Sequence, residues 1–147
     1  MNKLLFVLIL GGLLACAVQR PLSEDDPALF ILQKTACFGT CPVYLMRIAA
    51  DGRAYLHAKQ FMDKQGIYTA KFDEETIQTL RTSFEHIQFE RTFKESYRSS
   101  RSDLPTTYVT FDGYQVMDYD KQAPEAFQVL VGRLESFLDR PEWQKVK

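Results

Sequence analysis

Two Asp-Gly pairs constrain the fold of this chain more than any other feature of its sequence. Asp51-Gly52 and Asp112-Gly113 each separate two runs of residues that favour β-strands. Asp-Gly between such runs is typical of a tight β-hairpin turn. In the run before the first pair, Tyr44, Met46 and Ile48 alternate onto one face. The expected strands cover residues 28–35, 43–50, 53–60, 67–72, 106–111 and 114–119.

Two helices are expected, one between the hairpins and one after them. Asp73 is a good N-cap, and Glu74 and Glu75 suit the positive end of the helix dipole. Pro124 at a first helical position opens the second helix, which Pro141 ends. The order β-β-β-(β)-α-β-β-α predicts an α+β fold. In it, an antiparallel sheet built from hairpins carries both helices packed on one face.

Composition narrows the possible functions. The chain has 147 residues, of which 46% are hydrophobic and 13% aromatic, values that fit one globular domain. With 18 Lys and Arg against 19 Asp and Glu, the formal net charge is −1. Binding to a phosphate backbone relies on a strong positive field, which this balance does not supply. We therefore expect no nucleic acid partner.

The first residues indicate export. Lys3 precedes an apolar run over residues 4–14, which is the pattern of a secretory signal peptide. The run is shorter than the ~20 residues that a membrane-spanning helix needs, so such a helix is the poorer interpretation. Residues 13–16, LLAC, resemble the lipobox of bacterial lipoproteins, in which the Cys carries a diacylglycerol and the signal is cut before it. A soluble secreted protein cut near Ala15 or Ala17 is the alternative.

This interpretation divides the chain into three parts. Residues 1–15 are the expected lipoprotein signal peptide, residues 16–27 a lipidated N-terminus and flexible tether, and residues 28–147 a single domain. We expect acyl chains such as palmitate on Cys16 to anchor the protein to a membrane, which is therefore its expected partner. Because Ala17 rather than Asp follows that cysteine, the resemblance favours the outer membrane of the cell envelope, with the domain facing the periplasm.

The two other cysteines form the motif CFGTCP at residues 37–42. With Cys16 lipidated, the pair Cys37 and Cys41 remains in an oxidising compartment, which favours a disulfide. An extended chain holds Cα atoms four residues apart at roughly 13 Å, whereas a disulfide needs about 4.4–6.8 Å. The segment must therefore turn, and Gly39 and Pro42 make this feasible.

Two alternatives to a structural disulfide stay open for this pair. A C-x₃-C-P sequence also occurs in copper-handling thiol proteins, where soft thiolates bind Cu(I). Met46, His57 and His86 are the residues that could assist such a site. A redox-active thiol pair is the second alternative. The Cys and His spacing matches no compact zinc site, and we expect neither a bound metal nor another cofactor.

The remaining sequence favours binding over catalysis. The 147 residues contain no G-x-S-x-G, no H-E-x-x-H and no Gly-rich phosphate loop. Residues 89–103 are irregular and rich in Arg, and Arg with Tyr is enriched at interaction hot spots. The candidate binding surface consists of Tyr97, Arg98, Arg101 and Asp103. We therefore expect a non-catalytic binding or assembly module for an envelope protein or a small ligand. If this segment lies at the same end of the sheet as the Cys loop, the two would form the ligand or partner site.

The sequence also resembles a family of exported bacterial proteins. The motif CFGTCPVY at residues 37–44 resembles the opening of the domain of unknown function 6438 family. Later residues of the chain also resemble positions of that family, namely Phe89, Tyr97, DLPT at residues 103–106 and Trp143. The resemblance covers roughly residues 28–143. It implies an exported, often lipid-anchored domain and supplies no established activity.

Overall fold

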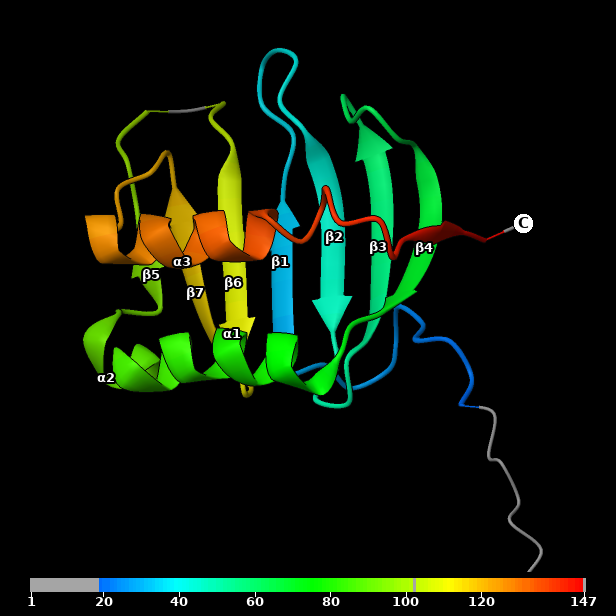
Figure 1. Ribbon diagram of the computed structural model, residues 1–147. Helices are drawn as coiled ribbons and strands as arrows, with labels where there is room; N and C mark the ends of the chain where they lie inside the picture. The colour runs from blue at the N-terminus through cyan, green and yellow to red at the C-terminus, as the bar shows by residue number, and fades with distance from the viewer. Residues whose placement is uncertain (1–18, 102, 147) are drawn as a thin grey trace, which may run out of the picture.

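The computed structural model describes residues 19–101 and 103–146, which form one eight-stranded sheet and three helices (Figure 1). The strand order across the sheet is β5-β7-β6-β1-β2-β3-β4-β8. The strands are β1 (Phe30–Lys34), β2 (Val43–Ile48), β3 (Arg53–Gln60), β4 (Gly66–Lys71), β5 (Ser96–Tyr97), β6 (Thr106–Phe111), β7 (Tyr114–Tyr119) and β8 (Gln144–Lys145). The helices are α1 (Glu74–His86), α2 (Phe89–Thr92) and α3 (Glu125–Glu135).

The expected α+β class is confirmed, with three additions. All strand pairs are antiparallel except β5 with β7, which is parallel. Residues 89–103, expected to be irregular, contain α2 and β5, and β8 was not expected at all. Short elements of two to four residues carry no readable hydrophobic period, so the sequence did not indicate them. Helix α3 ends at Glu135, before the predicted stop at Pro141.

The two Asp-Gly turns differ in form. In the second, Asp112 and Gly113 have φ of 48° and 87°, and Phe111 pairs with Tyr114, as in a two-residue turn. In the first, Gly52 has φ of 87° and its N–H donates to the carbonyl oxygen of Ala49 at 3.0 Å. The first loop is therefore longer than the second.

Helices α1 and α3 lie in front of the same face of the sheet (Figure 1). Asp73 caps α1 as expected, because its carboxylate accepts from the N–H of Thr76 at 2.8 Å. Pro124 is the N-cap of α3 rather than its first residue. The interior beneath the helices is rich in phenylalanine, and the fully buried rings are those of Phe30, Phe72, Phe84, Phe89 and Phe127.

Residues 19–27, expected to be a flexible tether, lie on the lower end of the sheet instead. The side chain of Leu22 is buried with Ala49 and Tyr55. The Arg47 guanidinium donates to the carbonyl oxygen of Asp26 at 2.7 Å. The predicted signal peptide and Cys16 lie outside the described residues. Among the helices of the described part of the chain, none has the length and hydropathy to cross a membrane.

Candidate functional site

The Cys loop, residues 35–42, lies at one end of the sheet, where β1 ends and β2 begins (Figure 1). The segment between β5 and β6 reaches the same end, because β6 begins there beside β1. The sequence left this proximity open. Both segments that carry the candidate residues therefore meet at the upper end of the sheet.

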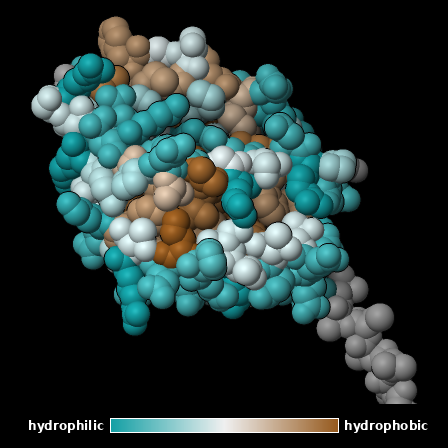
Figure 2. All heavy atoms as spheres, turned by 60° about the vertical axis from the view of Figure 1, so that its left-hand side comes forward, coloured by the Kyte–Doolittle hydropathy of each residue, from teal (hydrophilic) through white to brown (hydrophobic). Residues whose placement is uncertain are grey.

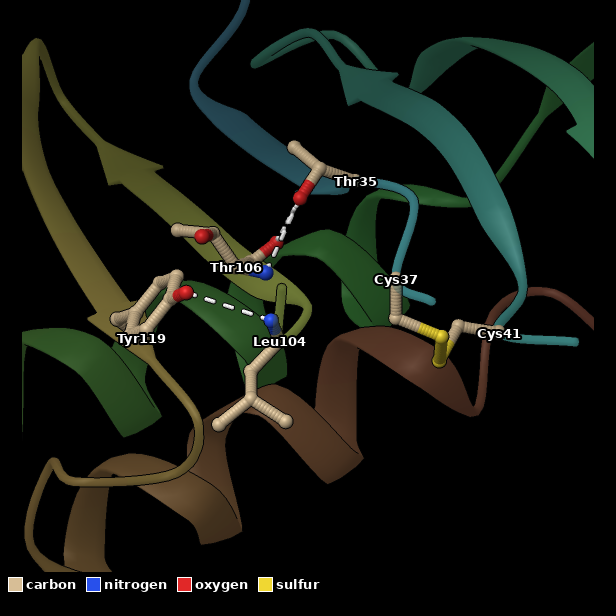
Figure 3. The surroundings of a disulfide bond; sticks show 6 residues. All are labelled: Thr35, Cys37, Cys41, Leu104, Thr106 and Tyr119. Carbon is tan, nitrogen blue, oxygen red and sulfur yellow. Dashed lines mark hydrogen bonds between the residues drawn. A yellow bond between two sulfur atoms is a disulfide. The ribbon is translucent and has the colours of Figure 1, made fainter. Parts of the chain in front are cut away.

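A disulfide joins Cys37 to Cys41, with their Cα atoms 5.8 Å apart, and closes the loop (Figure 3). The chain turns within it, since the N–H of Gly39 donates to the carbonyl oxygen of Cys37 at 2.9 Å. Phe38 lies inside this small ring, and its side chain is 94% exposed. The disulfide thus presents a large aromatic side chain to solvent on a short, closed loop.

Hydrogen bonds join the Cys loop to residues 103–106, and Figure 3 shows the one between Thr35 and Thr106. The N–H of Phe38 donates to the carbonyl oxygen of Asp103 at 3.1 Å. The N–H of Thr106 donates to Oγ1 of Thr35 at 3.0 Å. Two residues before Thr106, the N–H of Leu104 donates to the Tyr119 hydroxyl at 3.3 Å. The loop and residues 103–106 therefore form one connected surface.

Three of the four candidate surface residues reach this end with exposed side chains, and one does not. Arg98, Arg101 and Asp103 are exposed. Tyr97 pairs in register with the buried Asp118 and packs against the core. Its hydroxyl accepts from the N–H of Lys94 at 3.1 Å. Tyr97 therefore supports the segment from the helix side of the sheet.

A hollow of about 390 Å³ lies beside the two arginines. Its lining residues are Arg98, Ser99, Arg101, Thr106, Met117 and Tyr119. Thr106, Met117 and Tyr119 come from β6 and β7. Side chains alternate between the two faces along each strand, and these three point to the face opposite that of the buried Val109 and Asp118. Sequence reasoning missed them, although alternation along each predicted strand could have placed them on the face away from the helices.

The residues considered for a copper site do not meet at the Cys loop. Met46 is buried and in register with Leu32 and Leu56, in the core beneath the helices. His57 alternates onto the opposite face of β3, and His86 ends α1. Within the described residues, no group of three or more His, Cys, Asp or Glu could hold a metal ion.

An ion pair lies between the end of β1 and the end of α3. Lys34 pairs with Glu135, and the Tyr44 hydroxyl donates to Oε1 of Glu135 at 3.1 Å. Burial first, and then the charge of Glu135, raise the pKa of Tyr44 well above its ordinary value. The phenol therefore stays neutral and holds the carboxylate beside Lys34. This contact ties the C-terminal end of α3 to the strands that enter and leave the Cys loop.

A larger hollow lies elsewhere, in the groove between α1 and α3, with a volume of about 1080 Å³. Its apolar lining includes Ile87, Ala126, Val129 and Leu130. Figure 2, in which the left-hand side of Figure 1 comes forward, shows hydrophobic residues gathered in the middle of the face and surrounded by hydrophilic ones. Of the residues singled out in the sequence, Glu74, Glu75 and His86 line this groove.

Comparisons with known proteins identify a family and no further relative. No curated protein and no solved structure matches the chain. A family model described as a domain of unknown function, DUF6438, matches residues 28–138, which is more than half of the chain. The match spans the Cys loop, the arginine segment (residues 98–101, between β5 and β6) and α3. The chain therefore belongs to the DUF6438 family.

Proposed function

We propose that this protein is a lipid-anchored envelope domain that binds a partner through the Cys-loop end of its sheet. The observation that carries the proposal is the position of Phe38, 94% exposed on a loop closed by a disulfide and hydrogen-bonded to residue 103. An exposed aromatic side chain held on a closed loop loses little conformational entropy on binding, and this favours recognition. Arg98 and Arg101 flank the same end, and arginine is enriched among residues that dominate binding energy.

The position of the N-terminal segment supports an orientation in which the Cys loop points away from the membrane. Gln19 lies at the lower end of the sheet, where its Oε1 accepts from Nζ of Lys71 at 3.5 Å. The Cys loop lies at the upper end, beyond the other end of β1 (Figure 1). A chain anchored through Cys16 therefore directs the Cys loop away from the membrane. On an outer membrane, that direction is the periplasm.

The anchor is tested by fractionating cells that produce the intact chain or its Cys16→Ala variant. The intact chain is expected in the outer-membrane fraction and the variant in the soluble fraction or uncleaved in the inner membrane. Intact mass should show acyl chains on Cys16 of the first. An unmodified Cys16, or a variant that stays in the outer membrane, would show that the anchor is wrong.

The binding surface is tested by placing a photoreactive amino acid at position 38 of the full chain in its native cells. The matched control carries it at position 129, which is 52% exposed in the groove between α1 and α3. We expect a discrete crosslinked product from position 38 and none from position 129. A product from position 129 alone, or from neither position, would overturn the proposed surface.

A further inference from the structure

We infer that the hollow beside the Cys loop binds an oxyanion, a carboxylate or phosphate group of a soluble molecule. The hollow is the one lined by Arg98, Ser99, Arg101, Thr106, Met117 and Tyr119. The inference rests on the proposed function, because it names the ligand chemistry at the same end of the sheet. Several groups in the hollow still have hydrogen atoms to donate.

The polar groups of the hollow that are not main-chain atoms are donors. The Tyr119 hydroxyl accepts from the N–H of Leu104, so its own hydrogen is free to point elsewhere. The Ser99 hydroxyl accepts from the N–H of Arg101 at 3.2 Å and is free in the same way. Two guanidinium groups and the Thr106 hydroxyl complete the set. A lining with several free O–H and N–H groups is complementary to a ligand that offers acceptor oxygens.

The two arginines differ in how far they are neutralised. Within the described residues, the Arg98 side chain makes no hydrogen bond or ion pair. Nη1 of Arg101 lies 3.9 Å from the Asp120 carboxylate, and its side chain is 75% exposed. That separation is longer than a charge-assisted hydrogen bond. Arg98 therefore contributes its full charge, and Arg101 contributes donors that Asp120 does not saturate, which suits one anionic group rather than a polyanion.

Two further hydroxyl groups lack a hydrogen-bond partner among the described residues, that of Thr106 in the hollow and that of Ser96 on the strand beside Met117. Thr106 is only 7% exposed, yet it lines the hollow with a side chain that makes no hydrogen bond to the described residues. Ser96 lies in register with Met117, and its buried Oγ has no hydrogen-bond partner among those residues. The Ser96 hydroxyl is a buried group without a partner, and such groups are nearly always paired in folded proteins. A ligand oxygen in the hollow would give the Thr106 hydroxyl its acceptor.

The size and the position of the hollow limit the source of the anion. A volume of about 390 Å³ is near the lower end of the range for small-molecule sites. It fits a small acid or one phosphorylated group in contact with Met117. Because the proposed anchor directs this end away from the membrane, a headgroup of the same membrane would not reach it. The ligand class is therefore a soluble carboxylate or phosphate.

The test is an amide NMR titration of the intact chain in non-ionic detergent with sodium phosphate and with sodium acetate, at constant ionic strength. We expect saturable shifts at Ser99, Thr106 and Tyr119 with at least one of the two salts and none with sodium chloride. Vesicles that contain phosphatidylglycerol serve as the membrane arm. Shifts with vesicles alone would overturn a soluble ligand, and no saturable shift with either salt would overturn the site.

Matched variants separate this site from general charge effects. Arg98→Gln is expected to weaken binding roughly tenfold or more, whereas Arg91→Gln, an exposed arginine of α2, leaves it unchanged. Thr106→Val should weaken binding, whereas Thr107→Val, on the opposite face of β6, should not. Equal loss in Arg98→Gln and Arg91→Gln would mean that the anion interacts with net charge only, which contradicts the inference.

The two proposals fail in distinguishable ways. If the titration shows no binding but position 38 still gives its crosslinked product, the oxyanion site is wrong and the partner surface stands. If phosphate or acetate binds and position 38 gives no product, the hollow is a ligand site and the partner surface is wrong. If neither anion binding nor a crosslinked product from position 38 is observed, the Cys-loop end is not the functional surface.

Discussion

The main-chain N–H of Phe38 donates to the carbonyl oxygen of Asp103 at 3.1 Å and so joins two segments that are far apart in the sequence. Asp103 has φ of +66°, a left-handed conformation that is uncommon for residues other than glycine. In this conformation its carbonyl oxygen meets the Cys loop. The contact makes the arrangement of the arginine segment depend on the disulfide.

Removing the disulfide should destabilise the protein modestly and loosen the site. For the double variant Cys37→Ser, Cys41→Ser we expect a loss of about 2 kcal/mol in the free energy of unfolding, since the closed loop is short. Urea unfolding measures this loss, and reductant should reproduce it in the natural chain but not add to it in the variant. Hydrogen exchange should become fast at the Phe38 amide and stay slow at the Thr35 amide, which donates to Thr106. Slow exchange at Phe38 in the variant would contradict this dependence.

Two glycines with the same φ allow a matched test of the hairpin turns. Both Gly52 and Gly113 have φ of +87°. A Cβ at Gly113 would meet nothing within 4 Å, whereas one at Gly52 would lie 2.2 Å from the carbonyl oxygen of Phe72. Gly113→Ala should cost about 1–2 kcal/mol, and Gly52→Ala about 1–3 kcal/mol more. Equal losses in thermal or urea unfolding would show that the clash at Phe72 is relieved.

The buried Asp118 should be one of the most sensitive polar residues. Its carboxylate accepts from the N–H of Ala123 at 2.8 Å and from Nε2 of Gln128 at 2.7 Å, and so holds the start of α3 against β7. Asp118→Ala leaves the Ala123 N–H unpaired and Gln128 with only its 3.3 Å bond to the carbonyl oxygen of Ala123, and it is expected to cost about 2–3 kcal/mol in urea unfolding. Asp63→Ala, an exposed aspartate in the loop before β4, is the control and should change stability by less than about 0.5 kcal/mol. A similar loss in both variants would contradict this role.

The turn within residues 20–26, which the Asp26 carboxylate closes through Arg20 and Ser23, should loosen at low pH. The Arg20 guanidinium first, and then the Ser23 N–H, hold the pKa of Asp26 well below its ordinary value of 3.8. A lowered pKa in the folded state means that this contribution to stability is present above about pH 3.8 and is lost as the pH falls through the folded value. The Ser23 amide, which donates to Asp26 at 2.8 Å, reports this change in an NMR pH titration.

A variant tests the cause of that shift. In Arg20→Gln the titration midpoint of the Ser23 amide should rise toward 3.8, because the main contact that lowers the pKa of Asp26 is gone. Added salt should have a smaller effect in the same direction, since the Arg20 side chain is largely exposed and its charge is partly screened. An unchanged midpoint in the variant would assign the lowered pKa to the Ser23 N–H instead.

Much of the fold could be predicted from local sequence. Asp73 followed by two glutamates defined the start of α1, and each Asp-Gly pair defined a hairpin, because these signals act within a few residues. The second hairpin has the tight turn that was expected, and the first has a longer loop. The strand β5 was missed because two residues carry no period and its pairing with β7 is set by tertiary packing.

The candidate site was harder to predict, because its parts come from separate strands. The arginines were found from composition, but Tyr97 was grouped with them although it turns toward the core. Neighbouring residues on a strand point to opposite faces, so this error follows from treating the segment as irregular. Thr106 and Tyr119 face each other in register only once β6 and β7 pair, and no local signal connects them to the Cys loop.

The outermost strands have a further consequence. At each side the eight-stranded sheet ends in a strand of only two residues, β5 or β8. A long unpaired edge strand would offer a row of free N–H and C=O groups with which the edge strand of another molecule could pair. Short edge strands offer few such groups. Copies of this domain that crowd together in two dimensions, as on a membrane, would therefore approach edge to edge without joining their sheets.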